Sequence, residues 1–404
     1  MLAGVLLPLV ILLACAPGST ARRSPTPSHS PSKTAQARAT ATPSPSPTAL
    51  APPQPLHFQV QPIATGLVTP WQIVFGPNGM ALVTERPGRV RALQDGQLQP
   101  DPLLTLPVSS TPGNESGLLG MALHPAFPNP PWVYLYYTYG GASGKVNRVS
   151  RFTYTAGKLA SEQVLLDGIP GGVCCHFGGR LAFGPDGDLY VTVGEAQQPQ
   201  RAQDAHSLNG KILRLGADGG VPADNPFPGS PVYAFGFRNP EGLAWDPSGH
   251  LYVSDNGPTG DLGMCCHDEI DLVTAGGFYG WPLYAGNTST GQQPAGPLPN
   301  PVPAIVESGM ETWAPSGMTF YAPAPGQQPT LLVATLRGQA LRRFVIDPAH
   351  PDHVVTQEVV LSGYGRLRAV VAGADRCLYV LTSNRDGRGS PQADDDRVLR
   401  ACPG

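Results

Sequence analysis

Six copies of one short pattern constrain this chain more than any other feature. In each copy an apolar residue and a tight turn lead into a short strand-like run. The copies are FGPNGMALVTE from Phe75, LHPAFPNPPWVYLYYT from Leu123, FGPDGDLYVTVGE from Phe183, WDPSGHLYVSDNG from Trp245, FYAPAPGQQPTLLVATL from Phe320 and VAGADRCLYVLTS from Val371. Second strands of the type Arg-Val-x-Arg follow several of them: GRVRAL from Gly88, GKILRL from Gly210, QALRRF from Gln339 and DRVLRA from Asp396.

Units of β type that recur about every 50 to 75 residues are typical of a propeller, in which each unit is one blade. A single blade cannot bury its own faces, so the units must stack on one another. We therefore predict an all-β fold, a six-bladed β-propeller made of four-stranded antiparallel blades. In such a fold we expect function at one end of the central channel.

The start of the chain indicates export. Residues 3–14 are apolar and uncharged, and this run is too short for a mature membrane-spanning helix. The run ends in Leu-Leu-Ala-Cys at Cys15, the pattern of a bacterial lipobox, so residues 1–15 resemble a lipoprotein signal peptide acylated on Cys15. The usual positive n-region is missing, and a plain secretory signal cleaved nearby is the alternative. Both versions predict an extracytoplasmic protein, lipid-anchored to the bacterial cell membrane or secreted.

Residues 16–55 are rich in Pro, Ser, Thr and Ala and contain no acidic residue. Such a segment cannot bury enough apolar surface to fold, so we predict a disordered tether over 16–55 and one propeller domain over 56–404. That domain has room for six blades of about 60 residues each. The whole chain is only 14% charged with a net charge of −3, which gives no reason to expect a nucleic-acid partner.

Six cysteines follow Cys15, and an even number in an exported protein suggests disulfides. Cys377 opens the LYVLT strand and Cys402 ends its partner strand, so we predict a bridge between them. The other four form two adjacent pairs, each followed by histidine, at 174–176 and 265–267. These pairs could cross-link two loops, form strained vicinal rings that face a bound planar ligand, or make a thiolate and imidazole metal site. Adjacent cysteines rarely meet tetrahedral geometry at one ion, and exported thiols tend to oxidise.

Polar strings stand at the blade junctions, where loops converge on the axis. HFGGRLAFGPDGDLYVTVGE places His176 in a Gly-rich loop at the entrance of a blade. A lone histidine is usually a hydrogen-bonded structural residue, so its neighbours decide the interpretation. The other strings are GFRNPEGLAW from Gly236, DNGPTGD from Asp255, HDEIDLVTAGGFYGWP from His267 and YGRLRAVV from Tyr364.

In these strings the chain resembles the soluble quinoprotein glucose and aldose sugar dehydrogenases, six-bladed propellers that use pyrroloquinoline quinone (PQQ) and calcium. Matching strings cover residues 60–400 in the family's order, and the aldose sugar dehydrogenase branch is the nearer likeness. They are PWQIVFGPNGMALVTERPGRVRAL, ESGLLGMALHPAF, HFGGRLAFGPDGDLYVTVGE, NGKILRLGADGGVPADNPF, GFRNPEGLA, DEIDLVTAGGFYGWP, and RLRAVV followed by LYVLT. Activity is a separate question, because propellers host both enzymes and binding proteins.

The resemblance implies catalytic roles for His176 and Arg238. His176 would take the proton from the anomeric hydroxyl while hydride passes from C1 to the quinone, a task that suits a near-neutral imidazole. Arg238 would stabilise the quinone oxygen that gains negative charge. Calcium would be held by the backbone carbonyls of Gly257 and Pro258, would also hold the cofactor, and would polarise the quinone as a Lewis acid. Two carbonyls alone are a poor calcium site without the quinone and water.

Four further residues correspond to contacts of the PQQ cofactor: Asn239, Arg337, Arg366 and Arg368. Arg366 and Arg368 stand at i and i+2 of a strand, on one face, where paired arginines would bind the cofactor's carboxylates. Without the resemblance, a solvated arginine stripe on a blade edge would explain them equally well.

The chain departs from the family pattern mainly around the sugar. Glu115 stands where the glucose enzymes have a glutamine near the reaction centre, and it is our candidate substrate contact. Cys175 replaces an aspartate that contacts sugar, Arg337 replaces a cofactor-binding lysine, and Ser383 follows the last strand where an acid is expected. An extra loop, TGDLGMCCH, is inserted after Pro258 and could overhang the site. The cofactor shell is thus better preserved than the sugar shell.

We therefore predict an exported PQQ- and calcium-dependent dehydrogenase that oxidises aldose sugars at the anomeric hydroxyl to lactones and passes electrons to an external acceptor. A non-catalytic cell-surface propeller that binds carbohydrate or protein is the alternative. A binder has no need of His176, Arg238, Arg366 and Arg368 together. A metal-dependent lactonase, the third possibility, would need carboxylates and an asparagine that converge on an axial ion.

Overall fold

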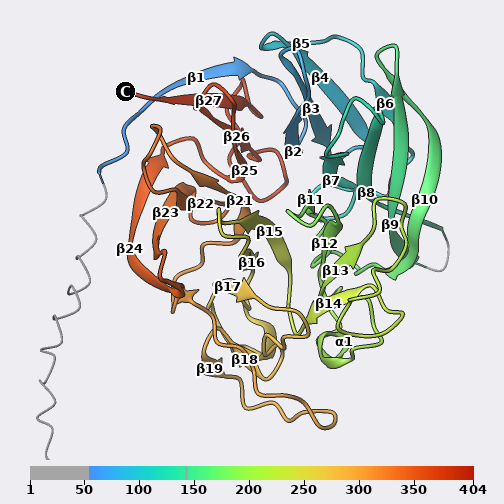
Figure 1. The fold of residues 1–404 in the computed structure, drawn as a ribbon, viewed down its shortest axis with the longest axis vertical. Coiled ribbons are helices and arrows are strands. Elements are labelled where there is room, and N and C mark those ends of the chain that lie inside the picture. The colour runs from blue at the N-terminus through green and yellow to red at the C-terminus, as the bar shows by residue number, and fades with distance from the viewer. Residues whose placement is uncertain (1–53, 142–143) are drawn as a thin grey trace, which may run out of the picture. The chain divides into compact units, whose positions relative to one another are not determined.

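The computed structural model describes residues 54–141 and 144–404 of this chain. Six sheets stand as blades around a central axis (Figure 1), which confirms the predicted all-β six-bladed propeller. The predicted signal peptide, 1–15, lies outside the described residues, and so does the predicted tether, 16–55, apart from residues 54 and 55. In the part of the chain that is described, no helix has the length and apolar character needed to cross a membrane.

The first three blades use their strands in chain order, from the axis outward. The first blade contains β2 (Pro70–Phe75), β3 (Met80–Glu85), β4 (Arg89–Gln94), β5 (Gln97–Leu98) and β6 (Leu104–Thr105), the last two both paired with β4. The second contains β7 (Leu118–Leu123), β8 (Trp132–Gly141), β9 (Gly144–Thr155) and β10 (Lys158–Pro170). The third contains β11 (Leu181–Phe183), β12 (Leu189–Val193), the short helix α1 (Gln200–Gln203), β13 (Lys211–Leu215) and β14 (Val232–Phe235).

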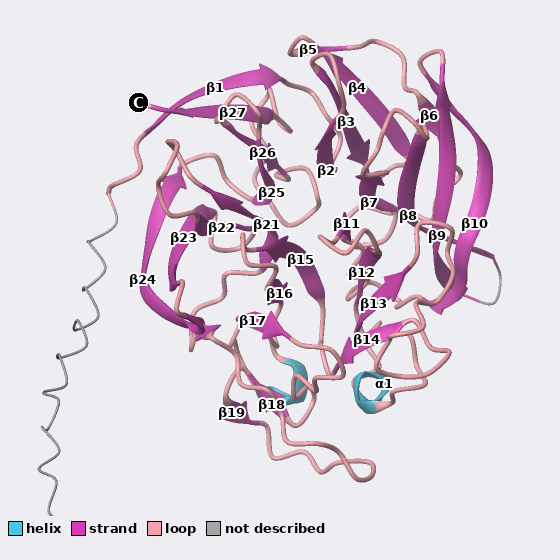
Figure 2. Cartoon of the chain, in the orientation of Figure 1, coloured by secondary structure: helices cyan, strands magenta, loops and turns pink. Residues whose placement is uncertain are grey.

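The other three blades repeat this order with two additions. The fourth contains β15 (Pro240–Trp245), β16 (Leu251–Asp255), the 3-10 turn η1 (Asp261–Gly263), β17 (Glu269–Val273) and β20 (Val306–Glu307), with a separate hairpin of β18 (Tyr284–Ala285) and β19 (Thr288–Ser289). The fifth contains β21 (Pro315–Tyr321), β22 (Thr330–Thr335), β23 (Ala340–Asp347) and β24 (His350–Ser362). The sixth contains β25 (Leu367–Ala372), β26 (Leu378–Thr382), β27 (Val398–Pro403) and β1 (Phe58–Ala64). Figure 2 shows how little of the described chain is helical.

The repeated pattern of the sequence corresponds to the inner half of each blade. The first copy, for example, begins at Phe75, the last residue of β2, and ends at Glu85, the last residue of β3. Every residue of β3, β12 and β22 is buried, because each of these strands has a neighbouring blade on both faces. The outermost strands β10 and β24 are mostly exposed.

The core lies between neighbouring blades rather than within any one of them. In the cluster between the second and third blades, Tyr134 of β8 packs with Val191 of β12 and Leu213 of β13. All three side chains are inaccessible to solvent. This is the burial that a single blade could not supply.

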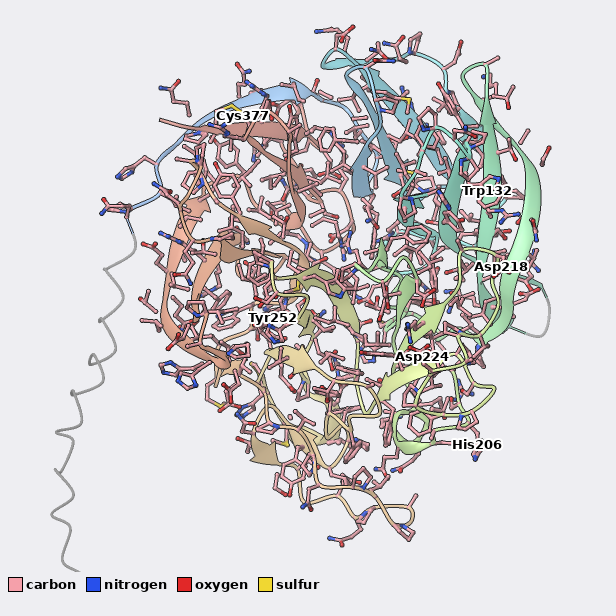
Figure 3. All side chains as sticks on the ribbon, in the orientation of Figure 1. Trp132, His206, Asp218, Asp224, Tyr252 and Cys377 are labelled. Atoms are coloured by element: carbon pink, nitrogen blue, oxygen red, sulfur yellow. A yellow bond between two sulfur atoms is a disulfide. The ribbon has the colours of Figure 1, made fainter. Side chains whose placement is uncertain are left out.

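The two ends of the described domain meet in the sixth blade. β1 pairs antiparallel with β27, with Val60 opposite Ala401. Cys377 and Cys402 form a disulfide with a Cα–Cα distance of 4.2 Å, which confirms the predicted bridge. Cys377 lies beside β27 at the edge of the ring (Figure 3). The C-terminus is therefore fixed both by strand pairing and by a covalent bond.

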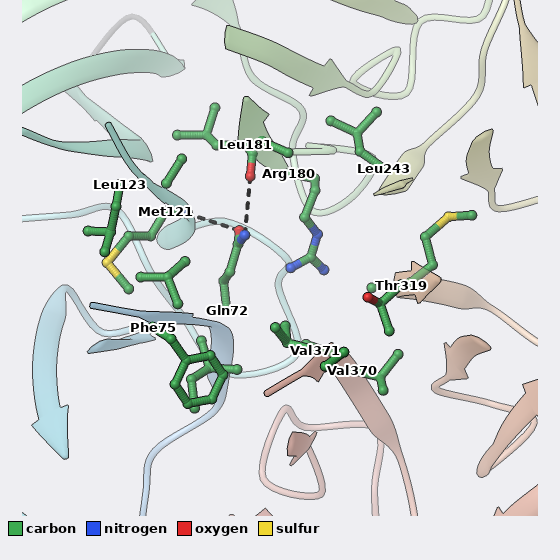
Figure 4. A pocket seen from close by; sticks show the side chains of 18 of the residues that line it. Gln72, Phe75, Met121, Leu123, Arg180, Leu181, Leu243, Thr319, Val370 and Val371 are labelled. Atoms are coloured by element: carbon green, nitrogen blue, oxygen red, sulfur yellow. Dashed lines mark hydrogen bonds between the residues drawn. The ribbon is translucent and has the colours of Figure 1, made fainter. Parts of the chain in front are cut away.

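The innermost strands surround an axial channel of about 410 Å³, shown in Figure 4. Gln72 crosses part of it, accepting a hydrogen bond from the Met121 amide at 3.0 Å and donating one to the Leu181 carbonyl at 3.2 Å. Arg180 stacks on Trp71 at 4.0 Å and donates Nε to the Glu241 carbonyl at 2.7 Å. Glu241 also lines a second cavity. Arg180 therefore lies between the channel and that cavity.

Candidate active site

A small polar cavity of about 50 Å³ lies where the innermost strands begin. Four of the predicted site residues line it: Glu115, Asn239, Arg366 and Arg368. The wall also carries the guanidinium groups of Arg86 and Arg388 and the carboxylates of Glu241 and Asp386. Four arginines against three carboxylates give the wall a positive balance. Such a wall suits a small ligand that carries more than one negative charge.

His176 lies beside this cavity in the loop between β10 and β11. Its Nδ1 faces the carboxylate of Glu195, which is only 1% exposed, while the imidazole is 12% exposed. A carboxylate partner keeps the proton on Nδ1 of a neutral ring and leaves Nε2 as the proton acceptor. A Cβ on Gly194 would lie 2.2 Å from the His176 carbonyl, so only glycine at this position lets the loop come so close. His176 and Glu195 thus form a pair in which Nε2 of the histidine makes no hydrogen bond to any residue of 54–141 and 144–404.

Glu115 connects His176 to a second loop. Its Oε2 accepts the backbone N–H of His176 at 2.7 Å, and its Oε1 accepts Nη1 of Arg388 at 2.6 Å. Burial alone would raise the pKa of Glu115, but the charge of Arg388 and the N–H donated by the His176 backbone outweigh burial and lower the pKa to about 2. Glu115 is therefore a carboxylate throughout the neutral range, unlike the glutamine of the family pattern.

Arg238 is held by carboxylates on two sides. Its backbone N–H donates to Asp255 at 2.8 Å, and the next amide, of Asn239, donates to the same carboxylate at 2.6 Å. The guanidinium donates Nη1 to the Asn256 carbonyl at 2.9 Å and forms an ion pair with Asp261. Burial raises the pKa of Asp255 to about 7, against the opposing effect of the two N–H donors. Asp255 thus fixes the backbone from which Arg238 and Asn239 project.

Asn239, Arg366 and Arg368 are all buried and hydrogen-bonded. Asn239 donates to Glu241 at 3.2 Å, and Nη1 of Arg368 pairs with the same carboxylate. Nε of Arg366 donates to Asp386 at 2.8 Å. Arg366 and Arg368 are 8% and 3% exposed, so the interpretation as a solvated stripe on a blade edge is wrong.

Arg337 does not join the other predicted site residues. It follows β22, it is exposed, and only its neighbour Leu336 lines the cavity. Its backbone N–H donates to the Trp313 carbonyl at 3.0 Å. The structure therefore places this arginine at the rim of the site.

Gly257 and Pro258, the predicted calcium ligands, directly follow β16. A Cβ on Gly257 would lie 1.9 Å from the Cys266 carbonyl, so a side chain cannot fit there. The Gly257 amide donates to Asp268 at 2.8 Å, and burial raises the pKa of that carboxylate. Within residues 54–141 and 144–404, the Gly257 carbonyl accepts no hydrogen bond, and no cluster of three or more His, Cys, Asp or Glu has the arrangement of a metal site. Backbone carbonyl oxygens are ligands that suit calcium, and the Gly257 carbonyl is not used by another described residue.

Each adjacent cysteine pair forms its own ring, Cys174 with Cys175 and Cys265 with Cys266. Of the three alternatives for these pairs, the cross-link between the two loops is therefore wrong, and so is a thiolate metal site, because each sulfur is bonded to its neighbour. Sγ of Cys175 lies 3.3 Å from Nη2 of Arg388 at the edge of the cavity. The structure shows the vicinal rings of the remaining alternative, and the planar ligand that they would face stays a prediction.

Several residues of the site were not predicted. They are Glu195, Glu241, Asp255, Asp261, Asp386 and Arg388. A signal existed for Glu195, because it ends the string that His176 begins, and the β11–β12 hairpin returns the chain to the same end of the blade. The loop that carries Asp261 stood out as an insertion that could overhang the site, but no signal singled out Asp261 within it, and the loop that carries Asp386 and Arg388 gave no signal.

The chain is similar to several known proteins. A family profile described as Glucose / Sorbosone dehydrogenase matches residues 67–391. The aldose sugar dehydrogenase of Escherichia coli is 31% identical, over 82% of this chain and 92% of that protein. Quinoprotein glucose dehydrogenase B of Acinetobacter calcoaceticus is 29% identical, over 85% and 88%. The PQQ-bound structure of aldose sugar dehydrogenase from Streptomyces coelicolor is 34% identical with a TM-score of 0.72, over 86% of this chain and 98% of that one.

Proposed function

Because the chain belongs to the glucose/sorbosone dehydrogenase family, we propose that it is a PQQ- and calcium-dependent dehydrogenase that oxidises aldose sugars to lactones. The observation that carries this proposal is the His176–Glu195 pair, with its free Nε2, beside a cavity walled by four arginines. Oxidation of an alcohol requires a base that takes the proton and an acceptor that takes the hydride. His176 would be the base, and an anionic cofactor bound by the arginines would be the acceptor.

His176 would act through Nε2. Glu195 holds Nδ1, so the ring cannot turn and the proton of the anomeric hydroxyl would pass to the opposite nitrogen. The imidazolium that forms would be stabilised by Glu195 through the ring and by Glu115, which accepts the His176 amide. Both contacts become more favourable as the positive charge develops, which lowers the barrier.

The chain's own residues fit the implied cofactor and metal. When bound, PQQ would supply the two-electron acceptor for the hydride of C1, and calcium would supply a Lewis acid. Arg366 and Arg368 would bind carboxylates, and Arg238 would face an oxygen that gains negative charge. Asn239 would add a polar contact, and the carbonyls of Gly257 and Pro258 would bind the metal.

The sugar end of the site favours a broad substrate class over glucose itself. Glu115 adds a charge where the family pattern has an amide, and its carboxylate is already shared between His176 and Arg388. Cys175 is locked in a ring and cannot replace a sugar-binding aspartate. We propose an aldose with few specific contacts, electrons passed to an external acceptor, and export with a lipid anchor at Cys15.

The proposal is tested by titrating the purified apo-protein with PQQ and calcium and following dye reduction with a panel of aldoses. Stoichiometric PQQ uptake with sugar-dependent dye reduction is the expected result. The control variant is Asp224→Asn, which removes a carboxylate that is 75% exposed and pairs with Arg214 away from the site. Lack of PQQ uptake at micromolar concentration with calcium present would overturn the proposal in favour of a carbohydrate- or protein-binding propeller.

A further inference from the structure

The inserted loop, residues 259–267, places a carboxylate directly on Arg238. Oδ2 of Asp261 accepts Nε of Arg238 at 2.8 Å and also accepts Nη2. The Arg238 side chain is only 6% exposed, whereas that of Asp261 is 39% exposed. The buried partner is thus fixed, and the exposed partner is the one free to leave.

The tip of this loop is weakly attached to the rest of the protein. Its internal contacts are an isolated bridge between Thr259 and Cys265 and three backbone hydrogen bonds, from the Gly260 amide to the Met264 carbonyl at 2.9 Å, from Gly263 to Gly260 at 3.2 Å and from Met264 to Asp261 at 2.9 Å. A Cβ added to Gly260 or Gly263 would have no atom within 4 Å, so these two positions touch no other segment, and the loop is anchored on its C-terminal side by Met264, which packs against the cluster of Ala202, Trp281 and Ala285. Moving such a tip costs little packing energy.

The cavity is too small for the cofactor that the proposed function requires. Its volume is about 50 Å³, whereas sites for ligands of that size range from roughly 300 to 1,000 Å³. Nη1 of Arg238 is already used by the Asn256 carbonyl, and its other edge is used by Asp261. An anionic ligand that needs this guanidinium must therefore displace Asp261.

We propose that Asp261 is a gate on the cofactor site, which holds Arg238 in the cofactor-free protein and releases it when the anionic cofactor binds. This inference rests on the proposed function. It predicts that binding is limited by opening of the loop, because only the open fraction is competent. Removing the charge of Asp261 should leave the site open and raise the apparent affinity for PQQ by the reciprocal of the open fraction. For an open fraction of about one tenth, the increase is about tenfold.

The test is stopped-flow binding of PQQ to the calcium-loaded apo-protein, followed by tryptophan fluorescence. Trp281 is a built-in reporter, because its ring lies 5.6 Å from the Arg238 guanidinium and is 3% exposed. In the wild type the observed rate should level off as the PQQ concentration rises. In Asp261→Asn the rate should rise linearly, and equilibrium titration should give a Kd lower by about tenfold.

Two controls separate the gate from other effects. Asp261→Glu keeps the charge and should retain the saturating rate, and Asp224→Asn removes a comparable exposed carboxylate from the third blade, where Figure 3 places it. Equal rates and affinities in wild type and Asp261→Asn would overturn the gate alone. If neither protein bound PQQ, the proposed function would fail and the gate would fail with it.

Discussion

The two Cys-Cys-His loops, 174–176 and 265–267, have the same sequence and much of the same local structure. In each loop the adjacent cysteines form a ring and the histidine has a positive φ, of 63° and 50°. In each, Nδ1 of the histidine faces a glutamate, Glu195 in the first loop and Glu307 in the second. The tripeptide alone therefore predicts the same role for both loops.

Their surroundings separate them. The His176 amide donates to the charged carboxylate of Glu115, whereas the His267 amide donates to the neutral carbonyl of Gly309 at 2.8 Å. Glu195 is 1% exposed, but Glu307 is 32% exposed and also accepts the Asn287 amide at 2.9 Å. The first loop therefore concentrates charge around a histidine at a cavity, and the second supports the backbone behind Gly257.

The largest difference between the loops should appear when each histidine is removed. His176→Ala should lower kcat by about 10³-fold, within the range for loss of a general base, and leave PQQ affinity within about twofold. His267→Ala should lower kcat by less than about tenfold, because this histidine only supports the loop. Single-turnover dye reduction and PQQ titration measure the two quantities separately. Equal loss of PQQ binding and of turnover in His176→Ala would contradict the role of base.

Substitution of the two glutamates, Glu195 and Glu307, should give the same contrast with smaller effects on kcat. Glu195→Gln keeps the shape but removes the charge that orients His176, and it should lower kcat by about 10- to 100-fold. Glu307→Gln should change kcat by less than about threefold, since its histidine is not at the cavity. The pH profile of kcat should move in Glu195→Gln and stay fixed in Glu307→Gln. Identical profiles in both variants would show that the buried pair has no special role.

The charge next to His176 should give only the first loop a pH-dependent contribution to stability. The pKa of Glu115 is lowered from 4.5 to about 2, so this carboxylate stabilises the fold above pH 4.5 and loses that contribution as the pH falls toward 2. The contribution is on the order of 3 kcal/mol at most. Urea unfolding should show wild type more stable than Glu115→Gln at pH 6, with the difference shrinking at pH 3. A difference independent of pH would show that Glu115 acts by packing alone.

The smallest effect concerns the two cysteine rings. Cys174 and Cys175 are partly exposed, whereas Cys266 is 2% exposed and its sulfur accepts the Thr312 hydroxyl at 2.8 Å. Mild reduction followed by alkylation and peptide mapping should therefore label the first ring several-fold faster than the second. Recovery of a peptide of one loop linked to a peptide of the other would contradict the pairing within each loop.

The fold could be predicted because its information is local. A copy such as FGPDGDLYVTVGE contains a whole turn and a whole strand, so six copies indicate six blades without any long-range contact. The pairing of β1 with β27 could not be read in this way, since FQVQPIA shares nothing with the repeats. The bridge between Cys377 and Cys402 followed from two strands of one repeat.

The site was predictable where strands position it and not where loops do. Arg366 and Arg368 stand on either side of Leu367, the first residue of β25, and the structure brings both to the cavity. Arg388 and Asp261 come from loops whose course depends on the whole assembled ring, so no local pattern reveals that they pair with Glu115 and Arg238. The pairing of the four loop cysteines was also left open, because the number of cysteines does not determine which of them form disulfides.

The pairing of β1 with β27 has a consequence for the order of synthesis. Residue 58 lies opposite residue 403, so β1, the first of the described strands to leave the ribosome, has no partner until β27 has been made. Until β27 has been made, the sixth blade lacks two strands and the ring stays open between its first and last blades. A chain that stops a few residues early would carry an unpaired β1 edge, which exposes truncated products to aggregation or proteolysis. The ring thus closes only on a chain whose C-terminal strand is complete.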